Sequence, residues 1–160
     1  PSAVAGLTGM ILSQHTAAVL NPHLPARILI EEIHKERFPV IIGEPTFWAL
    51  PGIVEAAKGV GTAGVVVAWD KASAEVSPYP GLEKMGPGSF RPPMPEIAVE
   101  RISSGTTGPP KRLGQTLVSL KNEMMLGVSK ESGVDEGPLT LKRSPSLNFR
   151  SLAHAGTLRG

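Results

Sequence analysis

Residues 39–68 read PVIIGEPTFWALPGIVEAAKGVGTAGVVVA, and this stretch decides the fold class. The branched run Val40-Ile41-Ile42 shows no polar alternation and ends at a glycine, which is typical of a strand covered on both faces. A helix is then predicted to begin near Thr46 and to end at Gly59. The buried side of this helix is predicted to consist of Trp48, Ala49, Ile53, Val54 and Ala57.

The sequence on both sides continues this alternation of helix and strand. Residues 64–68 (GVVVA) read as a second buried strand, residues 3–12 as a helix, and residues 16–20 as a strand. Pro25 begins an amphipathic helix that Pro39 ends. Because short connections between such elements require crossovers that return over a sheet, we expect an α/β fold. The sheet should be layered and mostly parallel, with helices on its faces.

Composition divides the chain into three regions. Residues 1–76 form the βα-type layered region. Residues 77–95 are rich in proline and glycine and read as a linker or excursion. Residues 96–160 are predicted to contain a strand at 97–99, a loop at 103–111, a helix and a downstream segment.

Charge and composition argue against several classes of protein. The 16 basic and 14 acidic side chains give a formal charge of only +2, and no interleaved aromatics accompany the late basic residues, so we expect no nucleic-acid partner. The chain has no cysteine, which fits a reducing compartment, and we expect a cytoplasmic location. No apolar run reaches the roughly 20 residues of a transmembrane helix. The chain opens with Pro1 rather than Met, which suggests a piece of a longer parent.

The loop at residues 103–111, SSGTTGPPK, carries the chemistry. Its glycines allow close backbone approach to an anion, its hydroxyls donate hydrogen bonds, and Lys111 neutralises charge, so the combination suits a polyphosphate. Two prolines separate Gly108 from Lys111, so this is not a Walker loop. By composition alone, a flexible surface loop is the competing interpretation.

The ordered run Ser103-Ser104-Gly105-Thr106-Thr107-Gly108-Pro109-Pro110-Lys111 is similar to the signature loop of the adenylate-forming ligase superfamily. Residues 18–22 and 39–43 also resemble the part of these enzymes that precedes the loop, and residues 151–154 resemble the downstream segment near the acyl pocket. The resemblance implies a portion of the large N-terminal domain of an AMP-forming, acyl-CoA synthetase-like enzyme. Such enzymes transfer AMP from ATP to a carboxylic acid with Mg²⁺, and many then form a thioester with coenzyme A.

Residue roles follow from the resemblance by position. The ATP phosphates would be bound by Ser103, Ser104, Gly105, Thr106, Thr107, Gly108 and Lys111. Lys111 would stabilise the charge of the departing pyrophosphate, and His154 would shape the substrate pocket. Arg112 stands where the family often has glycine, and it could stiffen the exit of the loop or add a second cation. The resemblance assigns no metal ligand in this chain.

Other family segments have no counterpart in this sequence. The aromatic-Gly-x-Thr-Glu segment, the Thr-Gly-Asp segment and the C-terminal catalytic lysine are all missing, so we expect the isolated chain to be inactive. Two alternatives stay open: a truncated, non-enzymatic remnant, and a simple nucleotide-binding module. Histidines 15, 23, 34 and 154 have no metal-ligand spacing, so no zinc site is expected. The identity of the acid, the use of coenzyme A and the oligomeric state stay open.

Overall fold

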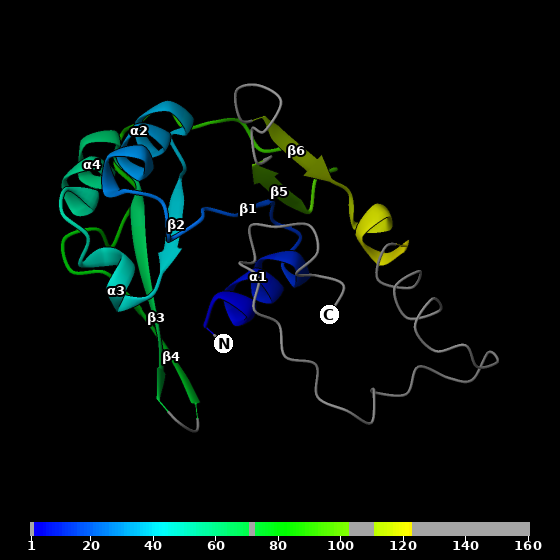
Figure 1. The fold of residues 1–160 in the computed structure, drawn as a ribbon, viewed down its shortest axis with the longest axis horizontal. Coiled ribbons are helices and arrows are strands. Elements are labelled where there is room, and N and C mark those ends of the chain that lie inside the picture. Colours follow the sequence, from blue (N-terminus) through cyan, green and yellow to red (C-terminus); the bar gives the residue numbers. More distant parts are fainter. Residues whose placement is uncertain (1, 71–72, 103–110, 123–160) are drawn as a thin grey trace. The chain divides into compact units, whose positions relative to one another are not determined.

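The computed structural model describes residues 2–70, 73–102 and 111–122 (Figure 1). The chain divides into two compact units, one of Pro1–Ser13 with Pro22–Met94 and the other of Gln14–Asn21 with Pro95–Gly160. Residues 14–21 belong to the second unit because the short strand that they contain pairs with a strand near residue 100.

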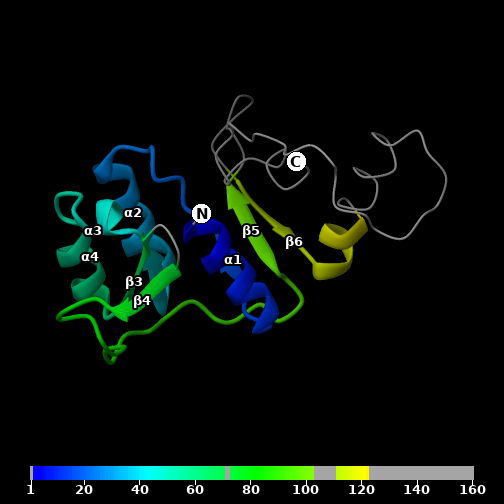
Figure 2. The ribbon, with the colours of Figure 1, turned by 90° about the horizontal axis from the view of Figure 1, so that it is seen from below.

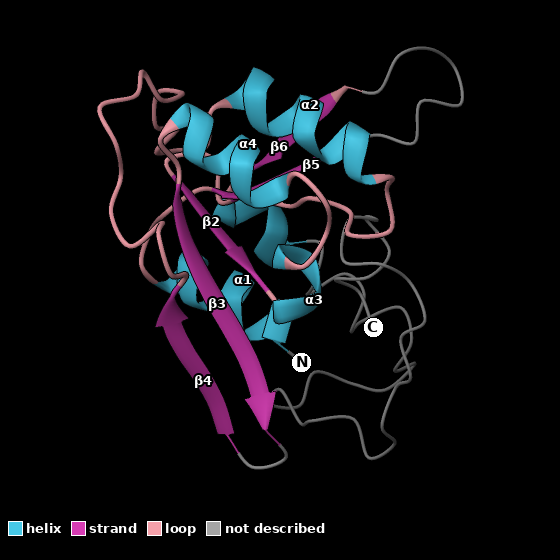
Figure 3. Ribbon diagram, turned by 90° about the vertical axis from the view of Figure 1, so that its left-hand side faces the viewer, coloured by secondary structure: helices cyan, strands magenta, loops and turns pink. Residues whose placement is uncertain are grey.

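The sheet of the first unit has three strands in the order β2-β3-β4. Strand β2 (Val40–Gly43) runs parallel to β3 (Ala63–Asp70), with Val40 opposite Ala63. The crossover predicted from residues 39–68 is therefore present. Strand β4 (Ser73–Pro78) then returns antiparallel to β3, and this long ribbon reaches beyond the helices of the unit (Figure 3). The antiparallel partner makes the sheet mixed.

Helices lie on both sides of the sheet but leave part of it open. Val40 and Ile42 of β2 are 42% and 39% exposed, so the prediction that this strand is covered on both faces is wrong, and β4 is exposed along its whole length. Helices α2 (Ala26–Glu36), α3 (Pro45–Trp48) and α4 (Ile53–Val60) lie on one side and α1 (Ser2–Leu12) lies on the other (Figures 1 and 2). The core between α2 and α4 is made by side chains four residues apart on each helix, which share a face. These fully buried side chains are Leu29, Ile33, Ile53 and Ala57.

The single helix predicted from Thr46 to Gly59 is in fact two helices. Pro51 lacks an amide hydrogen and Gly52 adopts a φ of 80°, so the chain leaves the helical path between α3 and α4. The break changes which residues face inward. Trp48, Ile53 and Ala57 are buried as predicted, whereas Ala49 is exposed.

Residues 77–95 have a defined course along the first unit. Residues 77–78 complete β4, and Tyr79 then packs against Trp48 with ring centroids 4.8 Å apart. Leu82 is buried, and the Gly86 amide donates to the Gly61 carbonyl at 2.8 Å. Further along, the Arg37 guanidinium donates from Nε to the Ser89 carbonyl at 2.6 Å. We call residues 79–91 the strap, since backbone and side-chain contacts hold them to this unit.

The second unit contains a smaller sheet with the order β1-β5-β6. Strand β5 (Val99–Ile102) is central, parallel to β1 (Ala17–Ala18) and antiparallel to β6 (Arg112–Gln115). The helix predicted from Leu117, Val118 and Leu120 is present at residues 117–122, but β6, which was not predicted, stands between the loop and this helix. Gly114 disfavours a helix in this stretch. In the folded strand it packs closely on Ile97, since a side chain at this position would begin 3.0 Å from Ile97 Cδ1.

The described residues thus form a mixed α/β structure with two small sheets. Each sheet holds one parallel and one antiparallel pair of strands, so the expected mostly parallel sheet is not what these strands form. None of the helices in the described ranges is both long enough and apolar enough to cross a membrane.

Candidate functional site

The loop predicted to bind phosphate joins the two antiparallel strands of the second unit. Residues 103–110 lie outside the described part of the chain, and so does His154. Their flanks are described: Ile102 ends β5 and lies opposite Arg112, the first residue of β6. Lys111 is exposed immediately before β6. The residues on either side of the loop therefore face each other across a hairpin.

Strand β5, which precedes the loop, ends at the edge where the parallel pair β1–β5 has its carboxyl ends. Because β1 and β5 are parallel, their carboxyl ends meet at one edge. The Val19 amide donates to the Glu100 carbonyl at 2.9 Å, which extends this pairing one residue beyond β1. The residues that follow β1, including Asn21, and the residues that follow β5 therefore begin at the same edge of the sheet. In open α/β sheets, that edge is the usual location of a ligand.

The hairpin distributes its charged side chains over both faces of the sheet. Side chains alternate along a strand, and register partners share a face. One face therefore carries Arg101 and Gln115, whereas the other carries Glu100 and Arg112. Each arginine has its own polar partner on the diagonally opposite position of the neighbouring strand.

On the first face, Arg101 and Gln115 form a buried polar pair. Arg101 is 8% exposed and Gln115 is also 8% exposed. The Arg101 Nη2 atom donates a short hydrogen bond to Gln115 Oε1. The Arg101 Nη1 atom is buried and makes no hydrogen bond in the structure. The buried Arg101 guanidinium thus donates from Nη2 to a neutral amide, whereas its Nη1 has no acceptor.

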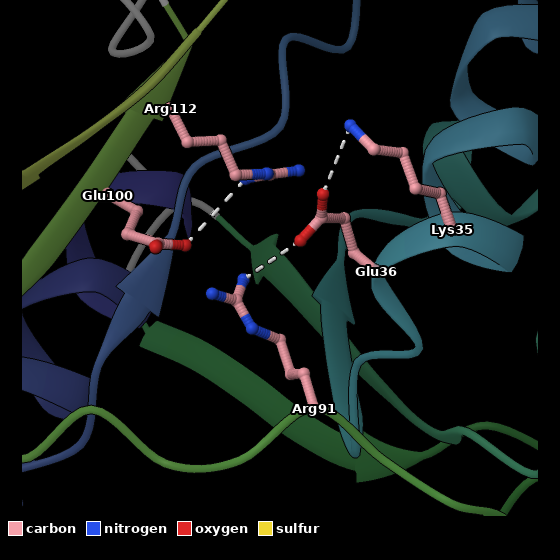
Figure 4. Close-up of polar contacts among 5 residues, drawn as sticks. All are labelled: Lys35, Glu36, Arg91, Glu100 and Arg112. Atoms are coloured by element: carbon pink, nitrogen blue, oxygen red, sulfur yellow. Dashed lines mark ion pairs between the residues drawn. The ribbon is translucent and has the colours of Figure 1, made fainter.

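On the second face, Arg112 and Glu100 form an ion pair. The Arg112 Nη1 and Glu100 Oε2 atoms are 3.8 Å apart, and the two side chains extend toward each other from neighbouring strands (Figure 4). Both side chains are largely buried, at 16% and 7% exposed. Together with Lys111 and Arg101, the base of the hairpin carries three cations and one carboxylate, so its charge is positive and suits an anion.

Sequence reasoning identified only part of this cluster. It singled out Lys111 and Arg112, but it did not single out Arg101, Glu100 or Gln115. The missing signal was the strand register, because Arg101 and Gln115 become neighbours only when β5 and β6 pair antiparallel. The sequence analysis predicted no strand between the loop and the helix that begins at residue 117, so these neighbours could not be identified.

A second charged cluster belongs to the first unit and holds the strap in place. The Glu36 carboxylate lies 3.4 Å from Lys35 Nζ and 3.4 Å from Arg91 Nη1 (Figure 4). The Arg91 guanidinium also lies 5.7 Å from the centre of the Phe38 ring. The Arg91 amide donates to the Arg37 carbonyl at 3.2 Å. These contacts fix the strap to the end of α2, which is a structural role.

The described histidines and carboxylates do not gather into a metal site. His15, His23 and His34 are all exposed. Across residues 2–70, 73–102 and 111–122, no three His, Asp or Glu side chains lie close enough together to hold a metal ion.

No protein-family model matches this chain, and no curated protein matches its sequence. The loop sequence and the geometry of the β5–β6 hairpin therefore carry the functional argument.

Proposed function

We propose that residues 103–111 bind the phosphates of ATP, in a chain related to the AMP-forming, acyl-CoA synthetase-like ligases. The proposal is supported by the described residues that flank the loop. Ile102 ends β5 at the carboxyl end of the parallel pair β1–β5, and Lys111 and Arg112 follow the loop. Glycines, hydroxyls and cations in that position supply the donors that a polyphosphate requires.

The reaction proposed for the parent family begins with a carboxylate and ATP. A carboxylate oxygen attacks the α-phosphorus, the bond from that phosphorus to the bridging oxygen breaks, and pyrophosphate leaves with the electron pair. The products are an acyl-adenylate and pyrophosphate, and a thiol such as that of coenzyme A then displaces AMP. Lys111 would lower the barrier by offsetting the charge that grows on the leaving pyrophosphate.

Further parts of the proposal concern the whole protein. We take the two mixed sheets to be portions of a larger layered domain with a mostly parallel sheet. Its substrates would be a nucleotide and a small carboxylic acid, with fatty acids as the first class to test. A cytoplasmic location is in keeping with a chain that has no cysteine. Mg²⁺ would accompany ATP.

Calorimetric titration of the purified chain with ATP tests the proposal. We expect Lys111→Ala to weaken ATP binding by about tenfold, because the variant loses a charge-assisted contact to phosphate. Lys58→Ala is the matched control, since Lys58 is an exposed lysine on α4 in the other unit. Equal ATP affinity in the Lys111 and Lys58 variants would remove Lys111 from the site. Absence of ATP binding in the unaltered chain would reject the function.

The second candidate function is a nucleotide-binding module without ligation chemistry. It would require only a phosphate-binding loop with its cation, which are the parts of the family's site that this sequence contains. Such a module would bind ATP with the same dependence on Lys111, and a longer protein that contains it would also form no AMP, unlike a complete ligase. A non-enzymatic remnant would bind neither ATP nor pyrophosphate.

A further inference from the structure

Strand β4 forms one edge of the sheet in the first unit. It pairs with β3 on one side, and across residues 2–70, 73–102 and 111–122 no strand pairs with its other side (Figure 3). All six residues of β4 are exposed. Proteins usually protect such an edge with lysines, a bulge or a covering segment, because its unpaired backbone groups can bind another strand. Strand β4 contains no lysine, and its register with β3 is unbroken. The edge of β4 is therefore available to another strand.

The backbone groups that face this free edge belong to alternate residues. The Tyr79 amide donates to the Gly64 carbonyl at 2.8 Å, so the backbone of Tyr79 faces β3. Because this direction alternates along an antiparallel strand, the backbone groups of Ala74, Val76 and Pro78 face away from β3. Pro78 lacks an amide hydrogen and offers only its carbonyl. The free edge thus presents donors at Ala74 and Val76 and acceptors at all three residues.

The same three residues give β4 an apolar face. Val76 lies opposite Val67 and Ala74 lies opposite Trp69, and such register partners share a face of the sheet. Val76 is 64% exposed and Trp69 is 48% exposed. A further strand beside β4 would cover Val76 from the side that β3 leaves open. Burial of that side chain would add a hydrophobic contribution to the backbone hydrogen bonds.

A second copy of β4 complements this edge in an antiparallel register. With Val76 opposite Val76 of the second copy, their amides and carbonyls pair with each other. The Ala74 amide then donates to the Pro78 carbonyl of the second copy, so the missing Pro78 amide hydrogen leaves only the Ala74 carbonyl without a donor. Glu75 lies opposite Ser77 in this register. Shifting the two strands by two residues instead would place Glu75 opposite Glu75, and like charges in that position destabilise a strand pair.

We propose that β4 is a homodimer interface, in which two copies of this chain pair their β4 strands antiparallel with Val76 at the two-fold axis. The sheet then continues across both copies in the strand order β2-β3-β4-β4-β3-β2. Because the same edge of each copy is used, the assembly closes at two copies. Two short strands make a small interface, and we expect a dissociation constant of about 10 μM. This inference is independent of the proposed binding of ATP.

Sedimentation velocity of the full 160-residue chain over a concentration series tests the dimer. Val76→Lys would set two ammonium groups opposite each other, so we expect the dissociation constant to rise by at least about tenfold. Val118→Lys is the matched control, because Val118 is 69% exposed in the second unit and its replacement should leave the dissociation constant unchanged. Equal dissociation constants in the two variants would overturn the proposal. A wild-type chain that is monomeric at about 100 μM would also overturn it, and β4 would then be open to a strand of a different protein.

Cysteine cross-linking tests the register and does not depend on the folding of Val76→Lys. The sequence contains no cysteine, so a single introduced thiol can react only with its copy. Val76→Cys would place the two thiols on Cα atoms about 5.5 Å apart, a separation that a disulfide spans. Ala74→Cys would place them four residues apart along the paired strands, about 13 Å, which a disulfide does not span.

After oxidation, we expect a denaturing gel to show a covalent dimer for Val76→Cys and a monomer for Ala74→Cys. Circular dichroism establishes that both variants are folded. Ala74 and Val76 are both exposed and share one face of β4, so random collisions would cross-link the two variants equally. Equal cross-linking, cross-linking of Ala74→Cys alone, or no cross-linking of either variant would overturn the proposal.

Discussion

Single polar side chains hold the first unit together at places where the backbone lacks a regular partner. Thr62 is 1% exposed, and its Oγ1 donates to the Phe38 carbonyl at 2.7 Å. The bond links Thr62, which directly precedes β3, to Phe38, which lies two residues before β2. Trp48 acts similarly, since its indole Nε1 donates to the Val65 carbonyl at 3.1 Å. Both bonds link segments that are distant in sequence, so neither could be predicted from local patterns.

Replacing Thr62 measures how much such a hydrogen bond contributes to the free energy of unfolding. Thr62→Val keeps the shape of the side chain but removes the hydroxyl, and we expect it to lower the free energy of unfolding by about 1–2 kcal/mol. Urea denaturation followed by circular dichroism measures this change. Thr46→Val is the control because Thr46 is exposed, and it should alter the free energy of unfolding by less than about 0.5 kcal/mol. Equal stability of the two variants would show that the Thr62 bond contributes little.

The Glu83 carboxyl gives a prediction about how stability depends on pH. The Gly81 amide donates to Glu83 Oε1 at 2.8 Å, and this backbone hydrogen bond lowers the pKa of the Glu83 carboxyl below its ordinary value of 4.5. A lowered pKa in the folded state stabilises the fold above pH 4.5, and the contribution is lost as the pH falls through the folded-state pKa. Because Glu83 is fully exposed, the effect on stability is small.

An NMR titration of the Glu83 side chain should therefore give a midpoint below 4.5 in the folded chain. A midpoint at or above 4.5 in the unaltered chain would show that the hydrogen bond is not formed in solution.

At the scale of elements, two glycines of α4 have opposite roles. Gly52 precedes the helix with a φ of 80°, and a side chain there would begin 2.8 Å from Ile30 Cδ1 of α2. Gly59 lies within the helix and has no atom within 4 Å of that position. Gly52 is required by its backbone conformation and by close packing. Gly59 has no such requirement, and it disfavours the helix because a glycine loses more backbone entropy on folding than other residues do.

This contrast predicts changes of opposite sign in one helix. Gly52→Ala should lower the free energy of unfolding by at least about 1 kcal/mol, because alanine is strained at positive φ and contacts Ile30. Gly59→Ala should raise it by about 0.5–1 kcal/mol through helix propensity. Thermal denaturation of the two variants beside the wild type measures both effects. If both variants changed the free energy of unfolding in the same direction, Gly52 and Gly59 would not have the opposite roles described here.

The elements also show why the prediction around the loop was incomplete. The strand before the loop was predicted from Ile97-Ala98-Val99, and β5 is found at Val99–Ile102. Strand β6 is only four residues long and contains Gly114, so hydrophobic periodicity gave no sign of it. The pairing of Arg101 with Gln115 depends on that strand. The loop could be found from sequence, but its polar surroundings required the register.

At the scale of the whole molecule, local patterns predicted elements better than their assembly. Residues 39–68 correctly indicated two parallel strands joined over helices, because apolar runs and glycines act locally. The return strand β4 was not predicted, since its residues are exposed and mostly small or polar. Likewise, the pairing of residues 17–18 with residues 99–100 depends on contacts across about half of the chain. Long-range pairing of this kind leaves little trace in a local pattern.

The last prediction concerns activity of the complete 160-residue chain. We expect ATP binding without release of pyrophosphate above background when ATP, Mg²⁺ and a panel of fatty acids are supplied. Acceleration requires that the carboxylate be held in line with the α-phosphorus, and binding the phosphates alone does not position the second substrate. The sequence lacks the segments that the family resemblance assigns to adenine, ribose and magnesium. A coupled pyrophosphate assay tests this expectation, with Lys111→Ala as the background control. Steady AMP formation that disappears in the Lys111 variant would contradict it and would mean that this chain positions both substrates by itself.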